Sequence, residues 1–128
     1  MNISKFTQKS VQAVQDLEKV AYEYGNQEVE QEHLLYALLT QEDSLILKLI
    51  EKMEINKDYF INTVKKALDA KVKVSGGDLR FGQYLNKSLV NAENEAKAMG
   101  DEYVSVEHLF LSLLTQPCTL PITSMRLF

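Results

Sequence analysis

The chain has 128 residues, 45% hydrophobic and 25% charged, and this composition predicts one folded domain with a substantial core. The 14 Lys and Arg against 18 Asp and Glu give a net charge of −4, which argues against nucleic-acid binding because phosphates require a basic surface. Apolar stretches of six residues or fewer are too short to predict a membrane span. The only cysteine, Cys118, cannot form an internal disulfide, so we expect a reducing, cytoplasmic compartment.

Helical periodicity dominates the first 70 residues. Apolar residues at steps of three, four and seven predict a long amphipathic helix over residues 3–24, ended by Gly25 in a left-handed cap. The same spacing predicts three further helices, at about residues 33–40, 44–53 and 57–70.

The helical pattern breaks at residues 71–80, which read KVKVSGGDLR. Val72 and Val74 alternate with lysines, and Gly76 and Gly77 form a flexible break. We expect this segment to be a surface linker between two halves of the domain.

The second half of the chain repeats the first. Residues 6–41 align without a gap on residues 81–116, a shift of 75 residues, and 13 of the 36 aligned positions are identical. The strongest blocks are Glu-His-Leu at residues 32–34 and 107–109, and Leu-Leu-Thr-Gln at residues 38–41 and 113–116. A period of 75 is longer than a usual solenoid unit, so we expect two pseudo-symmetric helical repeats that share one core.

The repeat fails after Gln116. Pro117 and Pro121 flank the position where the counterpart of the third helix should begin, and no counterpart of the fourth helix follows before Phe128. The sequence therefore predicts a second repeat, residues 81–128, that is truncated or irregular after residue 116, within a single domain spanning 1–128.

Two histidines, His33 and His108, occupy equivalent places in the repeats, each directly after a glutamate. This arrangement lacks the paired Cys or His spacing of a zinc site, so we expect no metal and interpret each as a histidine that fills a polar position at a helix start. Glu30 and Ser105 stand where the helix caps belong.

Enzymatic motifs are missing from the sequence. It has no Gly-x-Ser-x-Gly turn, and the Gly-Gly pair is not followed by the Lys-Ser or Lys-Thr of a phosphate-binding loop. We therefore predict no catalytic residues and no cofactor in this chain. A pseudo-symmetric bundle would instead have a groove at its seam, of the kind that holds peptide segments, although the same residues could simply be core and caps.

These features resemble a known family. Phe6-Thr7 opening a long helix, VEQEHLLYALL at residues 29–39 and GDEYVSVEHLFLSLL at residues 100–114 are similar to the Clp N-terminal domain, and most similar to its ClpB-type disaggregase branch. The resemblance covers about residues 1–116. It implies an all-α fold of two four-helix repeats, with a second repeat that departs from the family pattern after Pro117.

The resemblance also implies a function. In that family the domain is a mobile module of a hexameric ATP-driven ring, which threads aggregated polypeptides together with the Hsp70 system. The domain would bind exposed hydrophobic segments of unfolded or aggregated chains, while ATP and magnesium would belong to downstream modules. It would have no nucleic-acid or membrane partner, and in isolation it would be a monomer.

The family's substrate-contact residues carry over to Thr7, Leu89, Asp101 and Glu107. Thr7 matches the threonine that begins the first helix, Asp101 the Gly-Asp turn, Glu107 the glutamate that opens the sixth helix, and Leu89 an apolar groove position. Each polar member could instead cap a helix. The alternative function is an adaptor-docking domain of a protease-coupled Clp ATPase.

Overall fold

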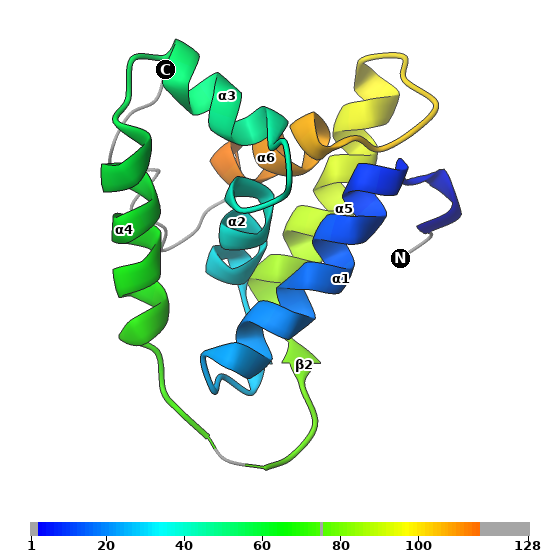
Figure 1. Cartoon of the computed structure of the whole chain (residues 1–128). Helices are drawn as coiled ribbons and strands as arrows, with labels where there is room; N and C mark the ends of the chain where they lie inside the picture. Colours follow the sequence, from blue (N-terminus) through cyan, green and yellow to red (C-terminus); the bar gives the residue numbers. More distant parts are fainter. Residues whose placement is uncertain (1–2, 75, 116–128) are drawn as a thin grey trace.

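The computed structural model describes residues 3–74 and 76–115, and it is mostly helical in these ranges (Figure 1). One 3-10 turn, six α-helices and two short strands follow one another along the chain. Their bounds are η1 Ile3–Lys5, α1 Gln8–Glu23, β1 Glu28–Val29, α2 Gln31–Leu39, α3 Leu45–Lys52, α4 Lys57–Asp69, β2 Arg80–Phe81, α5 Gln83–Ala98 and α6 Val106–Thr115.

The first long helix begins later than the apolar spacing predicts. The side chain of Thr7 accepts a hydrogen bond from the backbone N–H of Ser10, which makes Thr7 the N-cap and Gln8 the first helical residue. The preceding Phe6 is extended and pairs with Val104 in an isolated parallel bridge. Phe6 therefore belongs to a contact between the repeats and not to the helix.

Local sequence signals set the other helix ends. Ser44 and Asn56 cap α3 and α4, because their side chains accept the backbone N–H three residues later. Gly25 has φ 71° after α1 and Gly100 has φ 74° after α5, the left-handed conformation that favours glycine. The expected cap at Gly25 is therefore confirmed.

The two repeats exchange short extended segments. Phe6, which precedes α1, pairs with Val104 in the second repeat, and Phe81, which precedes α5, pairs with Val29 in the first. These pairs are related by the 75-residue shift. The backbone bonds follow the same relation, from Thr7 N–H to the Val104 carbonyl at 3.0 Å and from Gly82 N–H to the Val29 carbonyl at 2.8 Å. Each repeat thus completes the other.

The segment predicted as a surface linker is anchored at several points. The N–H of Val74 donates to the Gly25 carbonyl at 2.9 Å, and the Asn26 side chain donates to the Val72 carbonyl at 3.1 Å. Arg80 is part of strand β2. The segment does run over the surface, with Val72 79% exposed, but it follows a fixed path along the first repeat.

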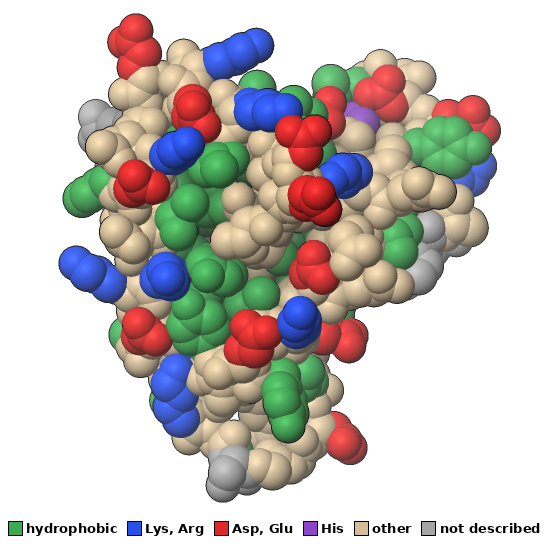
Figure 2. Space-filling model, viewed as in Figure 1, with side chains coloured by type: hydrophobic (Ala, Val, Ile, Leu, Met, Phe, Trp, Pro, Cys, Tyr) green, Lys and Arg blue, Asp and Glu red, His purple; other side chains and the backbone are tan. Residues whose placement is uncertain are grey.

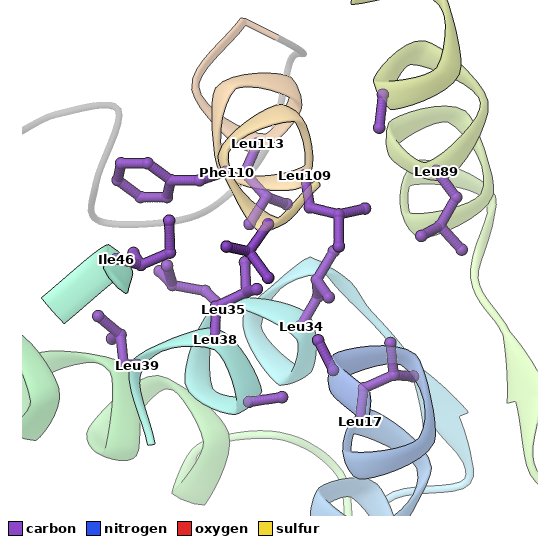
Figure 3. Packing of buried hydrophobic residues seen from close by; sticks show 14 of the residues in the cluster. Leu17, Leu34, Leu35, Leu38, Leu39, Ile46, Leu89, Leu109, Phe110 and Leu113 are labelled. Atoms are coloured by element: carbon purple, nitrogen blue, oxygen red, sulfur yellow. The ribbon is translucent and has the colours of Figure 1, made fainter. Parts of the chain in front are cut away.

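The core lies around α2, whose residues are all buried except the half-buried Tyr36. Helix α2 packs against α1, α4 and α6, and α5 packs against α6. Figure 3 shows leucines of α2 and α6, including Leu35, Leu38 and Leu109, pointing into one shared interior. A single core spanning both repeats explains how they form one unit.

The predicted all-α fold of two repeats is confirmed. Helices α1 to α4 form the first repeat, and α5 and α6 begin the second. The predicted irregular end of the second repeat, residues 117–128, lies outside the described residues. Among the helices of the described ranges, none combines the length and apolarity that crossing a bilayer requires.

Candidate functional site

Of the four residues that the family resemblance selects, Thr7 lies at the junction of the two repeats. Besides capping α1, its Oγ1 donates to Oγ of Ser10 at 3.0 Å, and its N–H donates to the Val104 carbonyl. Thr7 is half-buried, so part of its surface remains accessible to a ligand. Its interactions in this structure are those of a helix cap.

Leu89, expected at an apolar groove position, lies in the hydrophobic core. The side chain is 2% exposed and belongs to the hydrophobic core, on the face of α5 that packs against α6 (Figure 3). A polypeptide could reach it only by displacing core neighbours. The exposed apolar residue on this part of α5 is the adjacent Val90, which is 56% exposed. Leu89 is therefore a core residue in this structure and not part of an exposed apolar groove, and its contact with a client stays a prediction.

Asp101 is positioned by the histidine of the second repeat. Oδ2 of Asp101 lies 2.9 Å from Nε2 of His108, whose Nδ1 accepts the N–H of Ser105 at 2.9 Å. Because Nδ1 accepts a hydrogen bond, the ring proton is on Nε2, and the Nε2–H group donates a hydrogen bond to the Asp101 carboxylate. The Asp101 side chain remains 49% exposed, so a ligand can reach it.

The first repeat contains the same arrangement with two substitutions, Glu30 in place of Ser105 and Asn26 in place of Asp101. Nδ1 of His33 accepts the N–H of Glu30 at 2.8 Å, and Nε2 donates to Oδ1 of Asn26 at 2.9 Å. Asn26 thus stands where the second repeat has Asp101. Both histidines fill polar positions at helix starts, as the sequence predicts.

Burial keeps His33 uncharged. The loss of hydration, together with the nearby Lys71 ammonium, lowers the pKa of its imidazole from 6.5 to about 4. Its Nε2–H group already donates a hydrogen bond to Oδ1 of Asn26. This histidine is therefore a structural donor and acceptor at neutral pH, with no capacity to act as a base toward a ligand.

Glu107 and its counterpart Glu32 differ in their surroundings. Glu107 is exposed in the first turn of α6, whereas Glu32 is only 6% exposed and is paired with Nζ of Lys71 at 2.6 Å. Lys71 also bonds to Glu30. Burial acts to lower the pKa of the Lys71 ammonium, but hydrogen bonds to the two carboxylates outweigh it and raise the pKa.

A small depression lies beside Asp101, between the end of α5, the turn that follows it and Lys5. Its volume is about 260 Å³, and Ala96 and Val104 contribute apolar surface beneath a charged rim. Next to it, Met99 is 60% exposed and Tyr103 is 49% exposed. The depression is smaller and more charged than the apolar groove that the resemblance implies.

A second surface feature, an apolar band, is not predicted by the sequence. Figure 2 shows hydrophobic side chains gathered between α4 and α2, bordered by lysine, arginine and acidic side chains. Partly buried apolar residues on α2, α3 and α4 include Tyr36, Leu47 and Ile61, which pack against the core. Their spacing in the sequence is that of core residues, so only the packing reveals their partial exposure.

Among the described residues, no group of three or more His, Cys, Asp or Glu side chains could hold a metal ion. Cys118 lies outside these residues. The arrangement around Asp101 and Glu107 offers carboxylates, an exposed turn and a shallow apolar floor. Such a surface can bind a polypeptide, because it presents acceptors for N–H groups and ammonium ions.

Comparison with known proteins identifies the chain's relatives. The family described as "Clp repeat (R) N-terminal domain" matches residues 5–119. The chain is 39% identical over 124 residues to "Chaperone protein ClpB" of Nitratidesulfovibrio vulgaris, an alignment that covers 93% of this chain and 14% of the relative. The chain therefore spans about one seventh of that chaperone's length.

Solved structures show the same fold. The N-terminal domain of Hsp104 from Candida albicans matches with a TM-score of 0.80 at 20% identity, over 88% of this chain and 75% of that one. The N-terminal domain of the ClpV1 ATPase from E. coli matches with a TM-score of 0.83 at 19% identity, over 97% of this chain and 78% of that one. Sequence and fold agree: the chain belongs to the Clp N-terminal domain family, and its curated relatives are ClpB chaperones.

Proposed function

We propose that this domain engages exposed hydrophobic segments of unfolded or aggregated polypeptides for a ClpB-type disaggregase. The observation that carries the proposal is the match of nearly the whole chain to the N-terminal part of ClpB chaperones, at 39% identity in one case. An unfolded client differs from a folded protein by its exposed apolar side chains and free backbone groups, so a receptor for both must combine apolar and polar contacts.

The surface supports such binding. The apolar band between α4 and α2 offers contact area, and the depression beside Asp101 adds acceptors close to exposed Met99 and Tyr103. Because each buried methylene contributes only about 0.8 kcal/mol, shallow surfaces of this kind bind weakly and tolerate many sequences. Weak binding suits a domain that must release its client to a threading ring.

The proposal extends to the parent protein. ClpB relatives are about seven times longer than this chain, and we assign to the remainder of such a parent the hexameric ring, the ATP and magnesium sites and the contacts with the Hsp70 system. The location proposed for it is the cytoplasm. The domain itself contributes recognition and consumes no ATP.

A titration with an unfolded client tests the function. The ¹⁵N-labelled domain is titrated with reduced, carboxymethylated α-lactalbumin, and native α-lactalbumin serves as the folded control. We expect amide shifts around Asp101 and Glu107, or along the apolar band, with the unfolded form only. No shift at millimolar client would overturn the proposal.

The adaptor-docking alternative gives a different result in the same experiment. A surface for a folded adaptor would ignore both forms of α-lactalbumin.

A further inference from the structure

The first repeat holds an extended segment of its own chain, and this internal contact indicates what the second repeat can bind. Residues 71–74, with the sequence KVKV, run across the turn between α1 and α2. We call the residues that hold them the turn-1 surface: Tyr24, Gly25, Asn26, Glu30 and Glu32.

Two of the contacts involve the backbone of the segment. The N–H of Val74 donates to the carbonyl of Gly25 at 2.9 Å, and Nδ2 of Asn26 donates to the carbonyl of Val72 at 3.1 Å. Neither depends on the side chain of the valine concerned. They fix this segment, which is not part of a regular strand, in one register and leave its side chains for further contacts.

The remaining contacts use the two lysines. Nζ of Lys71 bonds to the carboxylates of Glu30 and Glu32, and Nζ of Lys73 donates to the Tyr24 carbonyl at 2.6 Å while lying 5.3 Å from the centre of the Tyr24 ring. Lysines at alternate positions therefore supply the charged part of the recognition.

The 75-residue shift places an equivalent surface on the second repeat, and there it is open. We call it the turn-2 surface: Met99, Gly100, Asp101, Ser105 and Glu107. Glu32 is 6% exposed beneath Lys71, whereas Glu107 is exposed. Tyr24 is half-buried, whereas Met99 in its place is 60% exposed. Within the described residues, no segment covers the turn-2 surface as residues 71–74 cover the turn-1 surface.

Three of the five positions differ between the two surfaces: Met99 replaces Tyr24, Asp101 replaces Asn26 and Ser105 replaces Glu30. The exchange of Asn26 for Asp101 changes most what the open surface selects. Asn26 offers its histidine an oxygen and offers the segment an N–H donor, but Asp101 has a second oxygen in place of that donor. A carboxylate there repels a backbone carbonyl and attracts an N–H or an ammonium. The adjacent Glu102 adds negative charge, partly offset by Lys5 at 3.9 Å. The turn-2 surface is thus suited to a cationic strand.

We propose that the turn-2 surface binds an extended client segment with lysines at alternate positions. The Glu107 carboxylate and the carbonyl groups of Met99 and Gly100 take the places of Glu32 and of the Tyr24 and Gly25 carbonyl groups, and the bond that Asn26 makes to a backbone carbonyl is replaced by attraction of the Asp101 carboxylate for an ammonium. This inference rests on the proposed function and names the class of client segment that one part of the domain selects. The alternate residues can be apolar, because Val72 and Val74 occupy those places in the internal contact.

Short peptides test the proposal. The probe is acetyl-AKVKVS-amide, the chain's own residues 70–75, and the comparison peptide is acetyl-AEVEVS-amide. We expect the lysine peptide to shift the amides of Gly100, Asp101 and Glu107 in the ¹⁵N-labelled domain. The glutamate peptide should bind at least about fivefold more weakly, and added salt should weaken the lysine peptide.

Two variants locate the binding. Glu107→Gln and Asp101→Asn should each weaken the lysine peptide by about two- to fivefold, the range of an exposed ion pair. Asp101→Asn preserves the bond to His108, because the first repeat makes the same bond with asparagine. Glu42→Gln, which removes an exposed charge from the connection between α2 and α3, is the matched control and should bind normally.

Equal binding of the two peptides, no binding, or shifts confined to the turn-1 surface or to the apolar band would overturn the inference. Its failure is distinguishable from failure of the proposed function. If unfolded α-lactalbumin binds but the lysine peptide does not, the inference is wrong and the function stands. If the lysine peptide alone binds at the turn-2 surface, the surface selects a lysine-containing segment, but the proposed function, binding of unfolded clients, is wrong.

Discussion

Lowering the pH should destabilise this domain through His33. Its imidazole is fully buried, with Nδ1 accepting from Glu30 and Nε2 donating to Asn26. Burial lowers the pKa of the ring from 6.5 to about 4 in the folded state. The unfolded chain therefore binds a proton at this position at a higher pH than the folded chain does. This contribution to stability is present above about pH 6.5 and is lost as the pH falls toward 4.

The size of the effect follows from the two pKa values. The full difference between 6.5 and about 4 corresponds to about 3 kcal/mol, of which about 2 kcal/mol would already be lost at pH 5. For a domain whose free energy of unfolding is typically about 5–15 kcal/mol, this is a measurable fraction.

Urea unfolding followed by far-UV circular dichroism, between about pH 7.5 and 5, measures the loss. Other groups also titrate in this range, so the comparison is with His33→Gln, whose amide oxygen can still accept the Glu30 N–H but does not titrate. The wild-type domain should lose about 2 kcal/mol more than the variant. Parallel pH profiles would refute the reasoning, because they would show that folding does not keep this imidazole neutral.

Four substitutions test the packing, the anchored linker and the glycine cap of α1 by the same urea assay. Leu89→Ala should cost about 2–5 kcal/mol, whereas exposed Val90→Ala should cost less than about 0.5 kcal/mol; equal costs would contradict the core position of Leu89. Lys71→Met should lower the free energy of unfolding by about 2–4 kcal/mol at neutral pH, because it leaves the buried Glu32 carboxylate without a cation. An unchanged urea midpoint would show that this ion pair does not stabilise the fold. Gly25→Ala should cost about 1–2 kcal/mol, because φ is 71° there, and a stabilised variant would show that the cap relaxes.

The candidate site was only partly predictable. Thr7, Asp101 and Glu107 could be selected by resemblance, and the structure leaves the side chains of Asp101 and Glu107 accessible. Whether they contact a client stays a prediction. The predicted groove position of Leu89 does not match its burial, because helical spacing places an apolar residue on one face of a helix without showing whether that face meets the core or the solvent.

The linker shows a similar limit. Alternating valines and lysines followed by two glycines predict an exposed connection, and the segment is indeed at the surface. Its anchoring depends on Glu30 and Glu32, about 40 residues earlier in the chain, and no local pattern reports such a pairing. The exchange of Phe6 and Phe81 between the repeats was hidden for the same reason.

The amino-acid sequence by itself determined the helices, their caps, the duplication and the family, because these depend on residues a few positions apart or on a repeated order of residues. Only the tertiary structure decided which of two equivalent turns is covered and which is open. That difference arises because residues 71–74 fold back onto the first turn, and contacts between distant segments are fixed by packing of the whole chain.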